Sequence, residues 1–186
     1  MSQQQDFDSK LLKVIIKKSD DEPFNEYLNR VQPHLTNFPE EVIREWLYRH
    51  DNFIQRFGHH DLVHWSFEEA KFTTQEILDI KLFPSKLDHV INAGNNIWRH
   101  PMIKDYEPAL SLRQKGTFPS PIIIFEDAGN YYDFTGENYL VPFHLAEGHK
   151  RYGQLKAIVD YPKRCQLVKP LLDSHNVYLL KMNGQV

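Results

Sequence analysis

One short apolar segment constrains the fold of this chain more than any other feature. Pro121-Ile-Ile-Ile-Phe125 is a continuous apolar run with turn-forming residues on both sides. Such a run is typical of a strand that is covered on both faces, as in a sheet with helices packed against it. We therefore predict a central, buried strand here and an α/β or α+β fold.

The remaining pattern alternates helical and strand-like segments. Further strands are predicted at residues 11–17, 131–132, 139–143 and 177–181, where β-branched or aromatic residues cluster. Helices are predicted at 23–32, 39–58, 73–80, 85–94, 107–115, 148–160 and 163–172, with residues 95–106 as a loop. Two stop signals, Gly94 and Gly116, are expected to end the helices that precede them. Helical character gives way to mixed character near residue 60, which predicts a helical extension at 1–60 and an α/β domain at 61–186.

Composition excludes several classes of protein. The chain has 186 residues, 41% hydrophobic content and a net charge of −3, so it lacks the overall positive charge that favours nonspecific nucleic-acid binding. Its single cysteine, Cys165, excludes an internal disulfide and a thiolate metal cluster. The sequence contains neither a secretion signal nor an apolar stretch of about 20 residues that would span a membrane. We expect a cytoplasmic protein without a membrane partner.

The segment Gly148-His149-Lys150-Arg151 has the chemistry of an anion site. It follows an apolar run and opens a predicted amphipathic helix. The first amides of a helix and its dipole attract anions, whereas basic side chains at that end are unfavourable unless an anion is bound. We therefore predict that these four residues bind a phosphate group.

Two carboxylates are candidates for chemistry beside this loop. Glu147 precedes the glycine, and Asp127 follows the predicted central strand. Either could act as a general base or hold Mg²⁺ bound to phosphates, and Glu147 could instead orient Arg151. Stabilisation of the helix dipole explains Glu147 at least as well, and turn capping is the more common explanation for Asp127. His60 and His64 have a spacing that ligates metal only on a helix, and Gly58 argues against a helix there, so no metal site is predicted.

Two segments together resemble a known family. Leu110-Ser-Leu-Arg-Gln-Lys-Gly116 followed by Pro119-Ser-Pro-Ile-Ile-Ile-Phe125 is similar to the helix-Gly-Pro-Ile-strand unit of the ParB/sulfiredoxin-like fold. Gly148-His-Lys-Arg-Tyr152 resembles the G-x-x-R phosphate loop of that fold. The resemblance covers residues 62–182 and implies that Gly148 and Arg151 cradle nucleotide phosphates.

The chain departs from the best-known members of that family. Sulfiredoxins carry a catalytic cysteine directly after the loop glycine, where this chain has His149. Too few residues follow the last predicted strand to form the helix-turn-helix domain that ParB proteins carry. Neither thiol chemistry nor partition in the full sense is therefore expected.

Three functions stay open at this point. The first is nucleotide or phosphate binding, with ATP or another nucleotide and Mg²⁺ as cofactors and phosphotransfer or hydrolysis as an optional step. The second is a DNA-associated or nuclease-like protein of ParB type. The third is a non-catalytic interaction protein in which residues 1–60 dock a partner or form a homo-oligomer. Whether the protein is an enzyme does not follow from its residues.

Overall fold

The protein has a mixed α/β fold. A computed structural model describes residues 11–99 and 106–183. The chain divides into two compact units, each assembled from separate stretches of sequence. Unit 1 comprises residues 1–67, 129–138 and 181–186, and unit 2 comprises 68–128 and 139–180.

Unit 1 is mainly helical. Its described elements are α2 (Phe24–Val31), α3 (Glu40–Val42), the π-helix η1 (Ile43–Tyr48), α4 (Phe53–Phe57) and the short η2 (Leu62–His64). The predicted helix at 39–58 is therefore present but changes type and is interrupted after Tyr48. The prediction of a strand at 11–17 was wrong, because residues 11–16 are α-helical.

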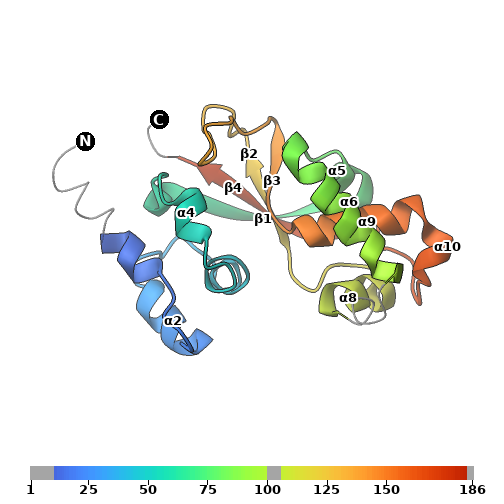
Figure 1. Ribbon diagram of the computed structural model, residues 1–186, viewed down its shortest axis with the longest axis horizontal. Coiled ribbons are helices and arrows are strands. Elements are labelled where there is room, and N and C mark those ends of the chain that lie inside the picture. Colours follow the sequence, from blue (N-terminus) through green and yellow to red (C-terminus); the bar gives the residue numbers. More distant parts are fainter. Residues whose placement is uncertain (1–10, 100–105, 184–186) are drawn as a thin grey trace. The chain divides into compact units, whose positions relative to one another are not determined.

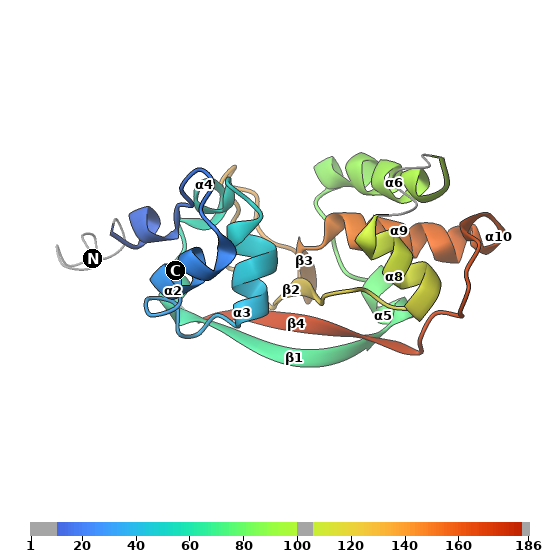
Figure 2. The same cartoon turned by 90° about the horizontal axis from the view of Figure 1, so that it is seen from below.

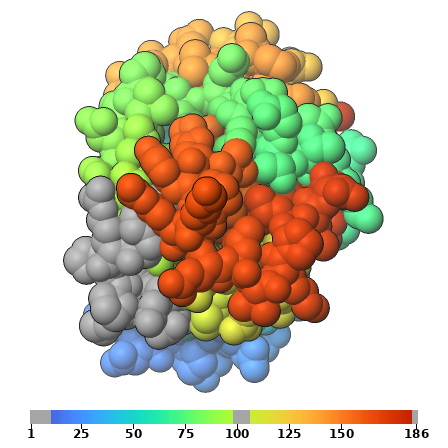
Figure 3. Space-filling model, turned by 90° about the vertical axis from the view of Figure 1, so that its right-hand side faces the viewer, coloured from blue at the N-terminus to red at the C-terminus, as the bar shows by residue number. Residues whose placement is uncertain are grey.

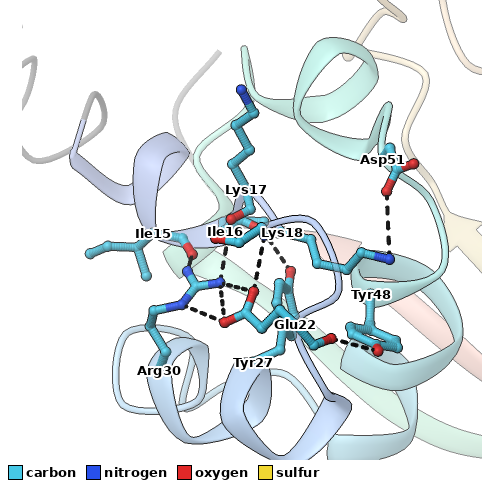
Figure 4. A network of polar contacts seen from close by, with 10 residues as sticks. Ile15, Ile16, Lys17, Lys18, Glu22, Tyr27, Arg30, Tyr48 and Asp51 are labelled. Carbon is cyan, nitrogen blue, oxygen red and sulfur yellow. Dashed lines mark hydrogen bonds and ion pairs between the residues drawn. The ribbon is translucent and has the colours of Figure 1, made fainter.

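Side chains from other elements stabilise the end of that first helix. The Tyr27 hydroxyl donates to the Ile16 carbonyl at 2.7 Å, and the Arg30 guanidinium donates to the Ile15 carbonyl and to both carboxylate oxygens of Glu22 (Figure 4). The Tyr48 hydroxyl donates to the Glu22 carbonyl at 2.8 Å. The bonds to the Ile15 and Ile16 carbonyls satisfy acceptors that the helix end leaves open, which stabilises a helix in this β-branched segment.

Four strands form one mixed sheet. They are β1 (Trp65–Thr73), β2 (Ile122–Glu126), β3 (Phe143–Glu147) and β4 (Ser174–Met182), arranged in the order β1-β4-β2-β3 (Figure 1). β2 pairs parallel with β4 and antiparallel with β3. The central, buried position predicted for residues 121–125 is confirmed, since Ile122, Ile124 and their neighbours in β2 are at most 1% exposed.

The predicted strand at 139–143 lies further along the chain. Tyr139 is buried, but its ring packs on Phe125 with the centroids 4.5 Å apart, and pairing with β2 begins only at Phe143. Pro142 explains the late start, because a proline has no amide hydrogen to donate to a neighbouring strand. Tyr132 pairs only through an isolated bridge to Asn138.

The helices of unit 2 include one that is longer than predicted. They are α5 (Thr74–Leu78), α6 (Pro84–Arg99), α8 (Glu107–Lys115), α9 (His149–Asp160) and α10 (Pro162–Cys165). The predicted capping box before α5 is confirmed, and α8 ends at Gly116 with φ of 75°, also as predicted. The polar helix expected over 163–172 is limited to the short α10.

Gly94 does not end a helix but lies inside α6. A Cβ at Gly94 would lie 2.2 Å from the Gly153 carbonyl oxygen, and one at Gly153 would lie 2.2 Å from that of Val90. The backbones of α6 and α9 are therefore in contact. On the face shown in Figure 3, the orange surface of residues near 150–160 lies beside the green surface of residues near 75–95. The loop predicted at 95–106 is helical up to Arg99, and its residues 100–105 lie outside the described residues.

Candidate functional site

The predicted anion loop lies where β3 passes into α9. Gly148 occupies the position before the helix with φ of 101° and ψ of 19°, a conformation that favours glycine. A Cβ there would lie 2.5 Å from the Cγ2 atom of Ile122 in β2. The turn is therefore closed tightly against the central strand, and both backbone conformation and space require glycine.

The start of α9 is electropositive. No side chain caps the helix, and its first turn contains no acidic residue. The shorter α5 differs, because Thr73 and Glu76 cap it reciprocally, and α8 has Glu107 in its first turn. Lys150 is exposed in the first turn of α9, and His149 is half-buried. An anion at this end would interact favourably with the helix dipole and with the Lys150 ammonium.

Arg151 lies differently from what the sequence suggested. It was expected to bind a phosphate group, but the residue is only 6% exposed. Its guanidinium forms an ion pair with Glu147 and donates from Nη1 to the carbonyl and hydroxyl oxygens of Ser120. A Cβ on Gly148 would lie 3.4 Å from Arg151 Nε. Arg151 therefore links the end of β3 to the segment before β2, beneath the glycine.

Glu147 is committed to this ion pair. Its side chain is 14% exposed, and the carboxylate bridges one turn of chain to Arg151. A carboxylate whose Oε2 already accepts from a guanidinium is less available as a general base, because that oxygen has a partner. The arrangement of Glu147 therefore suits support of the turn.

The structure does not bring Asp127 to the loop. Glu147 is opposite Ile123 near the start of β2, whereas Asp127 follows the end of that strand. Four residues of strand separate the two positions by roughly 13 Å. Asp127 is exposed, has φ of 49°, and its amide donates to the Pro142 carbonyl at 2.8 Å. These contacts are those of a turn residue.

The sequence did not reveal three polar residues around this end of unit 2. Ser120 receives the Arg151 guanidinium, and Gln154 is 2% exposed, with Oε1 lacking a hydrogen-bond partner among the described residues. His175 in β4 is 1% exposed, with its ring nitrogens 3.0 Å from Thr74 Oγ1 and 2.9 Å from Thr117 Oγ1. The three-residue spacing of Arg151 and Gln154 on α9 was the only available signal.

The described histidines gather into no metal-binding group, and the cysteine is buried. His59 Nε2 lies 2.9 Å from the Tyr132 carbonyl oxygen, and no group of three or more potential ligand side chains gathers within residues 11–99 and 106–183. Cys165 is buried in unit 2, and burial raises its pKa to about 11. The thiol is therefore protonated near neutral pH and is a poor nucleophile.

Comparison with known proteins identifies no relative. No protein family, curated protein or solved structure gives a significant match to the chain. Among the described helices, none is both long and apolar enough to cross a bilayer.

Proposed function

We propose that unit 2 is a ParB/sulfiredoxin-like domain that binds the phosphate group of a nucleotide at the start of α9. The observation that carries the proposal is the glycine turn before this helix. Gly148 has a positive φ, α9 has no capping side chain and no acid in its first turn, and Lys150 is exposed beside it. A bound phosphate would supply the missing negative charge.

The roles differ from those first assigned to the loop residues. The backbone amides after Gly148 and the Lys150 ammonium would contact the anion. Arg151 would act as a positioning residue, because its guanidinium is already bonded to Glu147 and Ser120. His149 follows the glycine directly and is half-buried at the rim of the loop.

The proposal is limited to binding. Glu147 would need to leave Arg151 before it could accept a proton or a metal ion, and Asp127 lies at the other end of β2. A nucleotide carrying Mg²⁺ would be held through its phosphates. Phosphate transfer is therefore not part of the proposal.

Isothermal titration with ATP, CTP, GTP and pyrophosphate, each with Mg²⁺, tests the proposal. Lys150→Ala should weaken binding by roughly tenfold, the value of one charge-assisted hydrogen bond. Lys156→Ala is the matched control, because this lysine is on the same helix but pairs with Asp160 two turns from the loop. Absence of heat with all four compounds at millimolar concentration would refute the proposal, as would equal losses in the two variants.

A further inference from the structure

The two edges of the sheet differ in how they are covered. The outer edge of β3 is covered by Lys81, whose amide donates to the Phe143 carbonyl at 2.9 Å and whose carbonyl accepts from the Leu145 amide at 3.0 Å. β1 forms the opposite edge, and no strand lies beyond it in the described parts of the chain (Figure 2). A nine-residue edge strand of this kind can pair with another strand.

The middle of β1 carries charged side chains on both of its faces. Successive side chains of a strand point to opposite sides of the sheet. Glu69 and Lys71 are exposed on one face, while on the other Glu68 is exposed and Ala70 is half-buried. Ala70 packs against the core of unit 2, so a strand that pairs with this edge would approach in the plane of the sheet, beside the charged side chains.

We propose that β1 pairs antiparallel with β1 of a second copy of this chain, with Ala70 opposite Ala70 on the two-fold axis. Symmetry and charge support a second copy of the chain as the partner of this strand. In an antiparallel pair, facing residues alternate along the strand between pairs that exchange two backbone hydrogen bonds and pairs that exchange none. When two identical strands are related by a two-fold axis, the pair of residue i in one copy with residue j in the other is equivalent to the pair of j with i, so both pairs must be of the same kind. The residue numbers of two facing positions must therefore differ by an even number. One residue then lies on the two-fold axis and faces its own copy.

Charge then selects one residue for the axis. With the axis at Glu68, Glu69 or Lys71, the central residue faces its own copy, so two like charges oppose each other. With the axis at Ala70, each Glu69 faces the Lys71 of the second copy, which gives two opposite-charge pairs on one face. Facing opposite charges stabilise antiparallel strands and facing like charges destabilise them. The charged residues that destabilise the other registers therefore favour the register centred on Ala70.

A charge-swap series tests the pairing in solution. We expect sedimentation of the full-length protein to show a concentration-dependent rise from 22.1 kDa toward twice that mass. Lys71→Glu and Glu69→Lys should each weaken association by at least roughly tenfold, since both facing pairs become repulsive. The double variant exchanges the two charges and should restore the dimer. Lys163→Glu, at an exposed position on α10, is the control that should leave association unchanged.

A disulfide test then fixes the register. Ala70→Cys should cross-link under mild oxidation, because facing Cα atoms of an antiparallel pair are about 4.5–5.5 Å apart, within the range of a disulfide. Glu68→Cys is the control, since the two copies of this position would lie roughly 13 Å apart along the strand. A wild type that stays monomeric up to millimolar concentration would overturn the proposal. So would a dimer insensitive to both single charge reversals, or a cross-link through position 68 rather than 70.

Discussion

Replacing Arg151 by methionine is expected to destabilise unit 2. The side chains of Arg151 and Glu147 are only 7% and 14% exposed, so the substitution leaves a largely buried carboxylate without its partner. Removing one member of a buried ion pair costs about 3–5 kcal/mol, and the residual exposure of Glu147 favours the lower end, about 3 kcal/mol. At 2–4 °C per kcal/mol for a protein of this size, the melting temperature should fall by roughly 6–12 °C.

Urea and thermal unfolding followed by circular dichroism measure this loss. Adding Glu147→Gln to Arg151→Met removes the unpaired charge, so the double variant should regain about 1–2 kcal/mol relative to Arg151→Met alone. Lys156→Met is the control on the same helix, because its pair with Asp160 is about 40% exposed on both sides. Exposed pairs contribute at most about 1 kcal/mol. If Arg151→Met cost no more than this control, the guanidinium would not support the loop as we argue.

The remaining predictions concern single positions. Gly153→Ala should separate α6 from α9 and destabilise the protein by at least about 2 kcal/mol in urea unfolding, because its Cβ would overlap the Val90 carbonyl oxygen. Gly148→Ala should lower both stability and anion affinity, measured by melting and titration, since φ is 101° there. Burial lowers the pKa of His60 from 6.5 to about 4. The folded state then binds fewer protons than the unfolded state, so unfolding free energy should fall as pH drops from 6.5 toward 4, and His60→Gln should reduce that slope.

The sequence predicted those elements whose signals are local. The apolar residues of β2, the Thr73–Glu76 capping box and the stop at Gly116 each need only a few neighbouring residues to form. All three were identified from the sequence, and the glycine turn before α9 was found in the same way. The local sequence was sufficient because a turn conformation, a helix cap and continuous burial each require particular residue types at neighbouring positions.

The errors arose where distant residues decide the structure. Residues 11–16 have a strand-like composition, but Tyr27 and Arg30 bind the carbonyls at the end of their helix. Gly94 looks like a stop signal, yet it is glycine because Gly153, 59 positions later, crosses it. Neither partner can be found from the segment itself, because the pairing exists only in the folded chain.

The orientation of Arg151 is the same kind of error, and it changes how the anion site must be tested. A basic residue in the first turn of a helix has two ways to be satisfied, an anion from solution or an acceptor within the protein. Ser120 and Glu147 are such acceptors here, and only the fold brings Ser120 to this place. A loss of binding in an Arg151 variant would therefore be ambiguous, since the turn at Gly148 would lose its support. Lys150 has no such structural task among the described contacts, so its substitution tests anion binding directly.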